Sequence, residues 1–219
     1  MKLKHFQKVV GEVFPSLPGI AKGEKEYENC LKHREFWDNL TDIEVKDVQE
    51  VVLPFLNKWQ CRLSYECATG LTKALRSVET MIKPFRGLNI ENADLLRCME
   101  VQGKKVDAFL RIQDIFDAVS KVRARKRTVA FTATSKILHM GLPNFFVMAD
   151  QKIRKKYGCE GNGAGYANFM WRMSVFARDL VTLAHGNKQR ILEFSKWGGR
   201  SLTRLLDNFN YTKYTLKKE

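Results

Sequence analysis

The stretch SKILHMGLPNFFVMAD, residues 135 to 150, holds the features from which the fold and the chemistry of this chain can be argued. Its first half continues a helical pattern that starts near Val129, and the pair Leu142-Pro143 breaks that pattern. A second apolar run follows and ends in Asp150. Lys136, set among apolar neighbours, and Asp150, which closes the next apolar run, are therefore the two side chains to explain.

Lys136 is predicted to lie at the edge of the apolar face of a helix. On a helical wheel that starts at Val129, it falls beside Val129 and Met140. Such a position removes an amine partly from water, and desolvation lowers the pKa of a lysine. An amine with a lowered pKa is partly neutral at pH 7 and can act as a nucleophile. The alternative is a structural lysine whose stem packs while its charged end reaches water.

Asp150 directly precedes the segment QKIRKKYG, residues 151 to 158, which reads as a helix. A carboxylate at this position is a good N-cap, because it accepts a hydrogen bond from a free backbone N–H of the first turn. The cations that follow it favour its ionised form. A rigid carboxylate at a helix start can also stabilise a nearby positive charge, so capping and chemistry are both open to Asp150.

The net charge of +14 is confined to the C-terminal half. Residues 1 to 118 contain 18 Lys and Arg and 18 Asp and Glu, whereas residues 119 to 219 contain 20 and 6. This asymmetry indicates a polyanionic partner, of which nucleic acid is the usual one. A group of cations at a helix end also suits the helix dipole. The residues expected to contact nucleic acid are Lys121, Arg123, Arg125, Lys126, Arg127, Lys152, Arg154, Lys155 and Lys156.

Helical periodicity dominates the chain and predicts an all-α, multi-helix globular fold. Thr41 and Glu44 have the spacing of a capping box, and Pro54 is expected to kink or end the helix that follows. Two lobes around a cleft are one arrangement of such helices: a neutral N-terminal lobe, 1–104, without an assigned function, and a basic lobe, 105–219. The predicted helices cover 41–56, 64–85, 106–127, 128–140, 151–158, 166–186, 188–197 and 201–211.

Several classes of protein are disfavoured by the composition. No apolar run approaches the roughly 18 residues of a membrane helix, and the N-terminal segment does not have the pattern of a secretory signal. A cytoplasmic protein without a membrane partner is therefore expected. The cysteine number is odd and no CxxC occurs, so neither a disulfide framework nor a metal site is predicted. Small buried hydrophobic residues are the expected role of Cys30, Cys61, Cys67, Cys98 and Cys159.

Three further features each have two interpretations. The glycines of GCEGNGAG, residues 158 to 165, form either a helix connector or a cradle for a phosphate. His139, one turn after Lys136, either modulates that lysine or is a hydrogen-bonded structural histidine. Phe146 and Trp171 either stack on a nucleobase or belong to the core.

SKILHMGLPNFFVMAD resembles the centre of the helix-hairpin-helix DNA glycosylases of the 8-oxoguanine type. FFVMAD resembles the short extended segment that ends in the family's aspartate, KIRKKYG the helix after it, and RLLDNFNY the C-terminal helix. The likeness covers roughly residues 105 to 215. It implies that the Lys136 amine attacks C1′ of a damaged nucleoside and forms a Schiff base. Asp150 then matches the carboxylate that stabilises the sugar cation.

The resemblance implies a DNA repair glycosylase, with or without AP-lyase activity, that excises an oxidised purine such as 8-oxoguanine. Its partner is double-stranded DNA with a damaged base, and neither a cofactor nor an obligate protein partner is expected. A second hypothesis is a non-catalytic nucleic-acid-binding protein on a glycosylase-like scaffold. A third is a basic helical interaction or defence protein that binds acidic partners.

Overall fold

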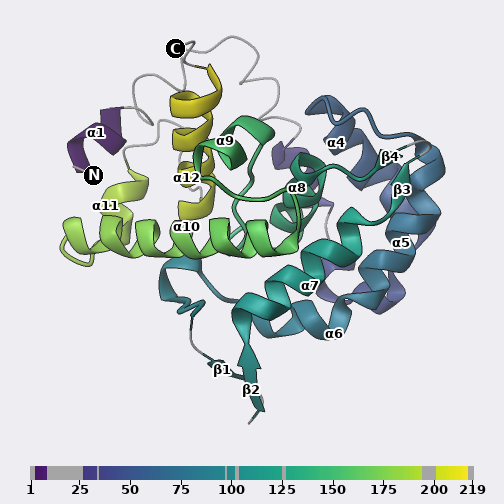
Figure 1. The fold of residues 1–219 in the computed structure, drawn as a ribbon, viewed down its shortest axis with the longest axis horizontal. Coiled ribbons are helices and arrows are strands. Elements are labelled where there is room, and N and C mark those ends of the chain that lie inside the picture. Colours follow the sequence, from purple (N-terminus) through teal and green to yellow (C-terminus); the bar gives the residue numbers. More distant parts are fainter. Residues whose placement is uncertain are drawn as a thin grey trace.

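The protein folds into an all-α structure, shown in Figure 1 by a computed structural model that describes residues 3–8, 27–33, 35–96, 98–101, 104–124, 127–193 and 201–216. Residues 27–32 are helical as well. The labelled helices are α1 (Leu3–Lys8), α3 (Val45–Asp47), α4 (Leu53–Lys58), α5 (Ala68–Ser77), α6 (Glu79–Ile82), α7 (Ala108–Ser120), α8 (Phe131–Gly141), α9 (Gln151–Lys156), α10 (Gly163–Leu183), α11 (Lys188–Leu192) and α12 (Leu202–Asn210).

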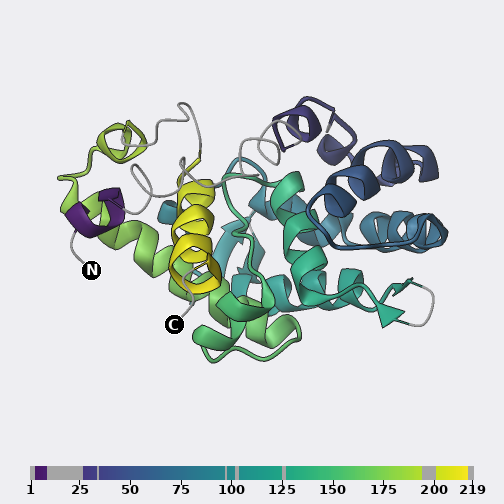
Figure 2. The same ribbon diagram turned by 90° about the horizontal axis from the view of Figure 1, so that it is seen from above.

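Helices from the two halves of the sequence lie on opposite sides of α7 and α8. Both views place α4 and α5 on one side and α10, α11 and α12 on the other (Figures 1 and 2). The N-terminal helix crosses over to the second side, because Phe6 packs against Phe176 of α10 and Phe209 of α12. Buried apolar residues from both halves form one continuous cluster. The boundary between 104 and 105 stays a prediction.

The segment predicted as a helix over 106–127 changes structure after Ser120. Helix α7 ends there, and the basic residues that follow contribute to a two-stranded hairpin, β3 (Arg123–Ala124) with β4 (Arg127–Thr128). In a helix, the like charges of this stretch would lie one turn apart and repel each other. The hairpin also directs the chain into α8, since the Val129 amide donates to the Val122 carbonyl at 2.9 Å. The prediction of a helical basic end was wrong.

The helix predicted from residue 41 begins later and passes through Pro54. Asn39 caps a 3-10 turn (η4, Leu40–Asp42), so Thr41 does not start the long helix. The Glu44 amide donates to the Asp47 carboxylate at 2.8 Å, directly before α3. A π-helical turn (η5, Val48–Val52) then leads into α4, in which Pro54 occupies the first turn. Helical structure therefore continues through Pro54, and the regular α-helix is interrupted by the wider π-helical turn directly before it.

Other predicted elements are observed close to their expected places. The segment 64–85 forms α5 and α6 with a break at Val78, and α8, α9, α10 and α12 lie within three residues of their predicted starts. A second hairpin, β1 (Cys98–Val101) with β2 (Lys104–Asp107), projects from the helical body in Figure 1. Cys30, Cys67 and Cys159 are buried as expected, whereas Cys61 is partly exposed and Cys98 is exposed. Within the described ranges, no helix has the length and apolar character that a membrane span requires.

The glycine-rich connector serves helix packing. A Cβ atom at Gly163 would lie 2.3 Å from the Gln113 carbonyl oxygen, so only glycine lets α10 start this close to α7. The Gly163 amide donates to Asp117 at 2.7 Å, and the Gly165 amide donates to Asn162 at 2.9 Å. Because side chains of the protein already accept from these amides, the connector interpretation fits this segment and the phosphate cradle does not.

Candidate active site

The extended segment after α8, residues 146–150, is held by polar side chains. Ser135 accepts from the Ala149 amide at 3.1 Å and lies 3.0 Å from the Ala149 carbonyl oxygen. One turn later, His139 Nδ1 lies 2.6 Å from the Phe146 carbonyl oxygen. A third side chain, Tyr166 of α10, donates to the Val147 carbonyl at 3.0 Å. These bonds replace the ladder that a buried extended strand would otherwise need, and they bring residue 150 back beside α8.

Of the two interpretations of His139, a modulator of Lys136 or a hydrogen-bonded structural histidine, its contacts fit the second. A carbonyl oxygen only accepts, so Nδ1 carries the proton in the bond to Phe146. Nε2 lies 2.8 Å from the Tyr27 hydroxyl, and the two rings stack with centroids 5.5 Å apart. The imidazole is fully buried. Its contacts therefore fix α8 against the extended segment and against residues 27–32.

Asp150 caps α9 as the sequence predicts. Its Oδ1 accepts from the Ile153 amide at 2.8 Å, and its backbone is extended at the helix start. Its Oδ2 accepts from the Thr215 hydroxyl at 2.5 Å. The carboxylate is thus partly buried and held at both oxygens.

Lys136 is partly buried on α8, as the helical wheel predicts. Its amine donates to the Trp59 carbonyl at 3.2 Å and lies 5.0 Å from the centroid of the Trp59 ring. The Cys61 thiol lies 3.9 Å from the same carbonyl oxygen. Lys136, Trp59 and Cys61 are therefore parts of one cluster, called the Lys136 cluster below. Arg204 and Asp207 belong to it, because Arg204 lies over the same Trp59 ring and pairs with Asp207. Asp150 acts on the Lys136 amine through its charge.

The surroundings of the Lys136 amine lower its pKa on balance. Burial lowers the pKa of Lys136, and the Arg204 cation lowers it further. Cys61, Asp207 and Asp150 oppose this and raise the pKa of Lys136, in that order of strength. The charge of Asp150 thus acts on the amine and favours its charged form. A desolvated amine near a fixed anion is the arrangement that nucleophilic lysines need.

Arg204 and Asp207 are the members of the cluster that sequence reasoning missed. Arg204 Nη1 donates to Asp207 Oδ2, and both residues are buried in α12. The Arg204 guanidinium lies 5.1 Å from the Trp59 ring and 5.0 Å from the Tyr27 ring. Burial raises the pKa of Asp207 to about 6, although Arg204 and Lys136 oppose the rise. RLLDNFNY contains these charges between apolar residues, which was the available signal.

The backbone around Cys61 is unusual. Gln60 and Arg62 have φ angles of 61° and 54°, in the left-handed region that residues other than glycine seldom adopt. The loop that they shape presents the Trp59 carbonyl to Lys136. Such conformations persist only where surrounding contacts impose them, and they are common next to functional sites.

The predicted nucleic-acid contacts differ in exposure. Lys121, Arg123, Lys152, Lys155 and Lys156 are exposed, and Lys152 also donates to the Thr215 carbonyl at 3.1 Å. Arg154 is partly buried, because it donates to the Cys159 carbonyl at 3.0 Å and lies 5.8 Å from the Phe131 ring. Arg125 and Lys126 lie outside the described residues, and for Arg127 only its backbone place in β4 is described.

The two aromatic candidates for base stacking differ in accessibility. Phe146 is fully buried and packs against Phe85, Phe145 and Tyr166. Its core interpretation therefore holds, and the ring is not accessible to a base. Trp171 is half-buried on α10 and stays a candidate.

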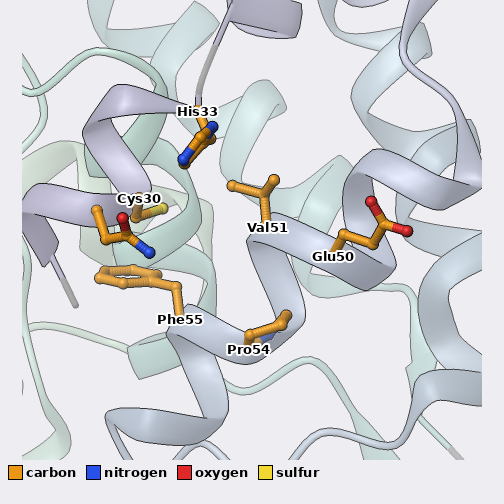
Figure 3. A pocket seen from close by; sticks show the side chains of 7 residues that line it. Cys30, His33, Glu50, Val51, Pro54 and Phe55 are labelled. Carbon is orange, nitrogen blue, oxygen red and sulfur yellow. The ribbon is translucent and has the colours of Figure 1, made fainter.

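A cavity of about 340 Å³ lies between residues 29–33 and residues 50–55 (Figure 3). His33, Glu50 and Phe55 are among the residues that line it. Phe55 also packs against Trp59, the residue that Lys136 contacts, with ring centroids 6.1 Å apart. None of the site residues predicted from the sequence lines this cavity.

Among the residues whose positions are described, no group of three or more His, Cys, Asp or Glu side chains could hold a metal ion. Comparison of the chain with protein-family models, with curated proteins and with solved structures finds no match. No family is therefore assigned to the chain.

Proposed function

We propose that the chain is a DNA glycosylase with AP-lyase activity, in which Lys136 is the nucleophile and Asp150 the stabilising carboxylate. The observation that carries the proposal is the partly desolvated Lys136 amine, which donates to the Trp59 carbonyl. The charge of Asp150 acts on the same amine. An oxidised purine such as 8-oxoguanine in duplex DNA is the proposed substrate. The exposed cations Lys121 and Arg123 support a polyanionic partner.

The proposed chemistry needs no group beyond the chain and the damaged DNA. The neutral amine attacks C1′, the bond from C1′ to the base breaks, and the base leaves with the electron pair and takes up a proton. Asp150 offsets the positive charge that develops on the sugar. Opening of the sugar ring then gives a Schiff base on Lys136, and loss of a C2′ proton breaks the bond from C3′ to oxygen. The target base must leave the stack for this attack.

Borohydride trapping tests the proposal. The protein is incubated with a duplex that carries 8-oxoguanine, and borohydride then reduces any Schiff base to a stable amine. Wild type is expected to give a covalent adduct and free base, and Lys136→Gln is expected to give no adduct. Lys73→Gln is the matched control, because Lys73 is an exposed lysine of α5 outside the predicted DNA contacts and its loss leaves the nucleophile in place.

Base release is measured separately from the adduct in the same experiment. Release without an adduct indicates a monofunctional glycosylase, in which water and not Lys136 attacks C1′. Adduct formation that persists in Lys136→Gln assigns the nucleophile to another amine. If no oxidised purine gives either base release or an adduct, the glycosylase proposal is contradicted.

A second candidate function is favoured by one contact. The Lys136 amine already donates to the Trp59 carbonyl, as a structural lysine does. A non-catalytic nucleic-acid-binding protein with the same scaffold is consistent with that bond. It predicts duplex binding that weakens with salt, without base release, and Lys136→Gln then lowers stability and changes no chemistry.

A further inference from the structure

The candidate catalytic carboxylate is held from two directions. Asp150 Oδ1 accepts from the Ile153 amide of its own helix, α9, at 2.8 Å. Asp150 Oδ2 accepts from the Thr215 hydroxyl at 2.5 Å. Thr215 belongs to a π-helical segment (η9, Tyr211–Leu216) that follows α12 at the C-terminal end of the described chain. A residue far away in sequence therefore completes the hydrogen bonding of Asp150.

The segment that carries Thr215 is itself fixed against α9. Lys152 donates to the Thr215 carbonyl at 3.1 Å, and the Tyr157 and Tyr214 rings meet edge to face at 5.7 Å. The Tyr157 hydroxyl donates to Asn210, at the end of α12, at 2.8 Å. Figure 1 shows α9 and α12 next to each other, in agreement with these contacts. Thr215 is thus presented to Asp150 by a segment that has little freedom to move.

We propose that Thr215 is a positioning residue that fixes the plane of the Asp150 carboxylate. The inference rests on the proposed function and assigns the C-terminal segment to the same site. With the cap bond alone, the carboxylate can pivot about the bonded oxygen, and its second oxygen is undirected. A hydrogen bond to each oxygen removes that freedom. Displacement of a catalytic group by about 1 Å is enough to slow a reaction substantially.

Rates of base release under single-turnover conditions test the positioning role. Thr215→Val removes the hydroxyl and keeps the shape, and it is expected to slow base release about tenfold or more. Its affinity for the duplex should be unchanged, because the Thr215 hydroxyl is already bonded to Asp150 and the substitution removes no charge. Thr215→Ser keeps the hydroxyl and should restore the rate.

Thr212→Val is the matched control from the same segment. Thr212 is buried, and its hydroxyl has no hydrogen-bond partner within the described part of the chain. Its removal should therefore leave base release at the wild-type rate. Equal slowing by Thr212→Val and Thr215→Val would mean that the segment acts through general packing, and it would overturn the assignment of Thr215.

A double-mutant cycle tests the contact without any activity. The effect of Thr215→Val on the unfolding equilibrium should largely disappear in an Asp150→Ala background, which leaves the hydroxyl no partner at position 150, whereas the effect of Thr212→Val should be the same in both backgrounds. Additive effects of Thr215→Val and Asp150→Ala overturn the inference. A coupled pair with an unchanged rate of base release overturns the positioning role. A wild type that releases no base contradicts the proposed function instead, and the cycle still reports on the contact.

Discussion

At the residue scale, Asp207 is a buried carboxyl whose charge is disfavoured by its surroundings. Burial raises its pKa to about 6, Arg204 and Lys136 oppose the rise, and Asp150 adds to it. In an unfolded chain the pKa of an aspartate is about 4. Between these two values the folded protein binds more protons than the unfolded chain at this residue. The contribution of Asp207 to the free energy of unfolding is therefore fully present below about pH 4 and is lost as the pH rises through about 6.

Comparison of wild type with Asp207→Asn isolates this dependence. The free energy of unfolding of wild type, relative to that of the variant, should fall by up to about 3 kcal/mol between pH 4 and pH 7. Urea denaturation across this range measures the difference. Asp114→Asn, at an exposed position of α7, is the control and should show no such trend. A difference that stays constant with pH would contradict a titrating Asp207.

The residues of the Lys136 cluster differ in how far the sequence could predict them. Lys136 and Asp150 are marked by local signals, a charge at the edge of an apolar face and a carboxylate before a helix. Trp59 has no such local signal, and the charges of RLLDNFNY do not indicate which residues they meet, because the part of Trp59 and Arg204 in the cluster depends on α4 and α12 meeting α8. A contact between elements distant in sequence is set by packing, and one sequence without an alignment does not encode it in a readable pattern.

At the element scale, the position of Asp150 depends on how α8 holds the extended segment. Ser135 makes two bonds to Ala149, the residue before Asp150. Ser135→Ala leaves the Ala149 amide and carbonyl buried without this partner, which should destabilise the protein by about 1–3 kcal/mol. We also expect slower base release, because Asp150 follows directly. Urea denaturation and single-turnover rates measure the two effects.

Ser174→Ala is the matched control for that change. Ser174 is a fully buried serine of α10 whose hydroxyl donates at 2.8 Å to the Trp171 carbonyl of its own helix. Its loss should cost less, since that carbonyl can keep its bond to the helix, and base release should be unaffected. Equal effects of the two substitutions would show that Ser135 has no special role in placing the segment.

Some helix ends could be predicted from the sequence and others could not. The capping position of Asp150 was predictable because the cap bond is local. The end of α7 at Ser120 was not, because apolar periodicity continues through Val122. There the repulsion between successive cations and the need to lead into α8 decide the structure. The π-helical turn before Pro54 likewise arises from a backbone adjustment that propensities do not describe.

At the scale of the whole molecule, charge and packing are distributed differently. The apolar core is continuous across both halves of the sequence, whereas the net charge of +14 comes from residues 119–219 alone. The all-α fold follows from helical periodicity and was predictable, while the return of α1 to the C-terminal helices was not. Under the proposed function, the cations that meet the DNA come from the C-terminal half of a chain whose two halves share one core.

The salt dependence of duplex binding tests this division of charge. Lys121→Gln combined with Lys155→Gln removes two exposed cations from the basic half, and Lys73→Gln combined with Lys83→Gln removes two exposed cations from the neutral half. Both double variants have the same net charge. The first should weaken binding and reduce the slope of log affinity against log salt by about 2, since each phosphate contact contributes about 0.9. The second should leave the slope unchanged. Equal reductions in both would show that DNA responds to total charge and not to the surface of the basic half.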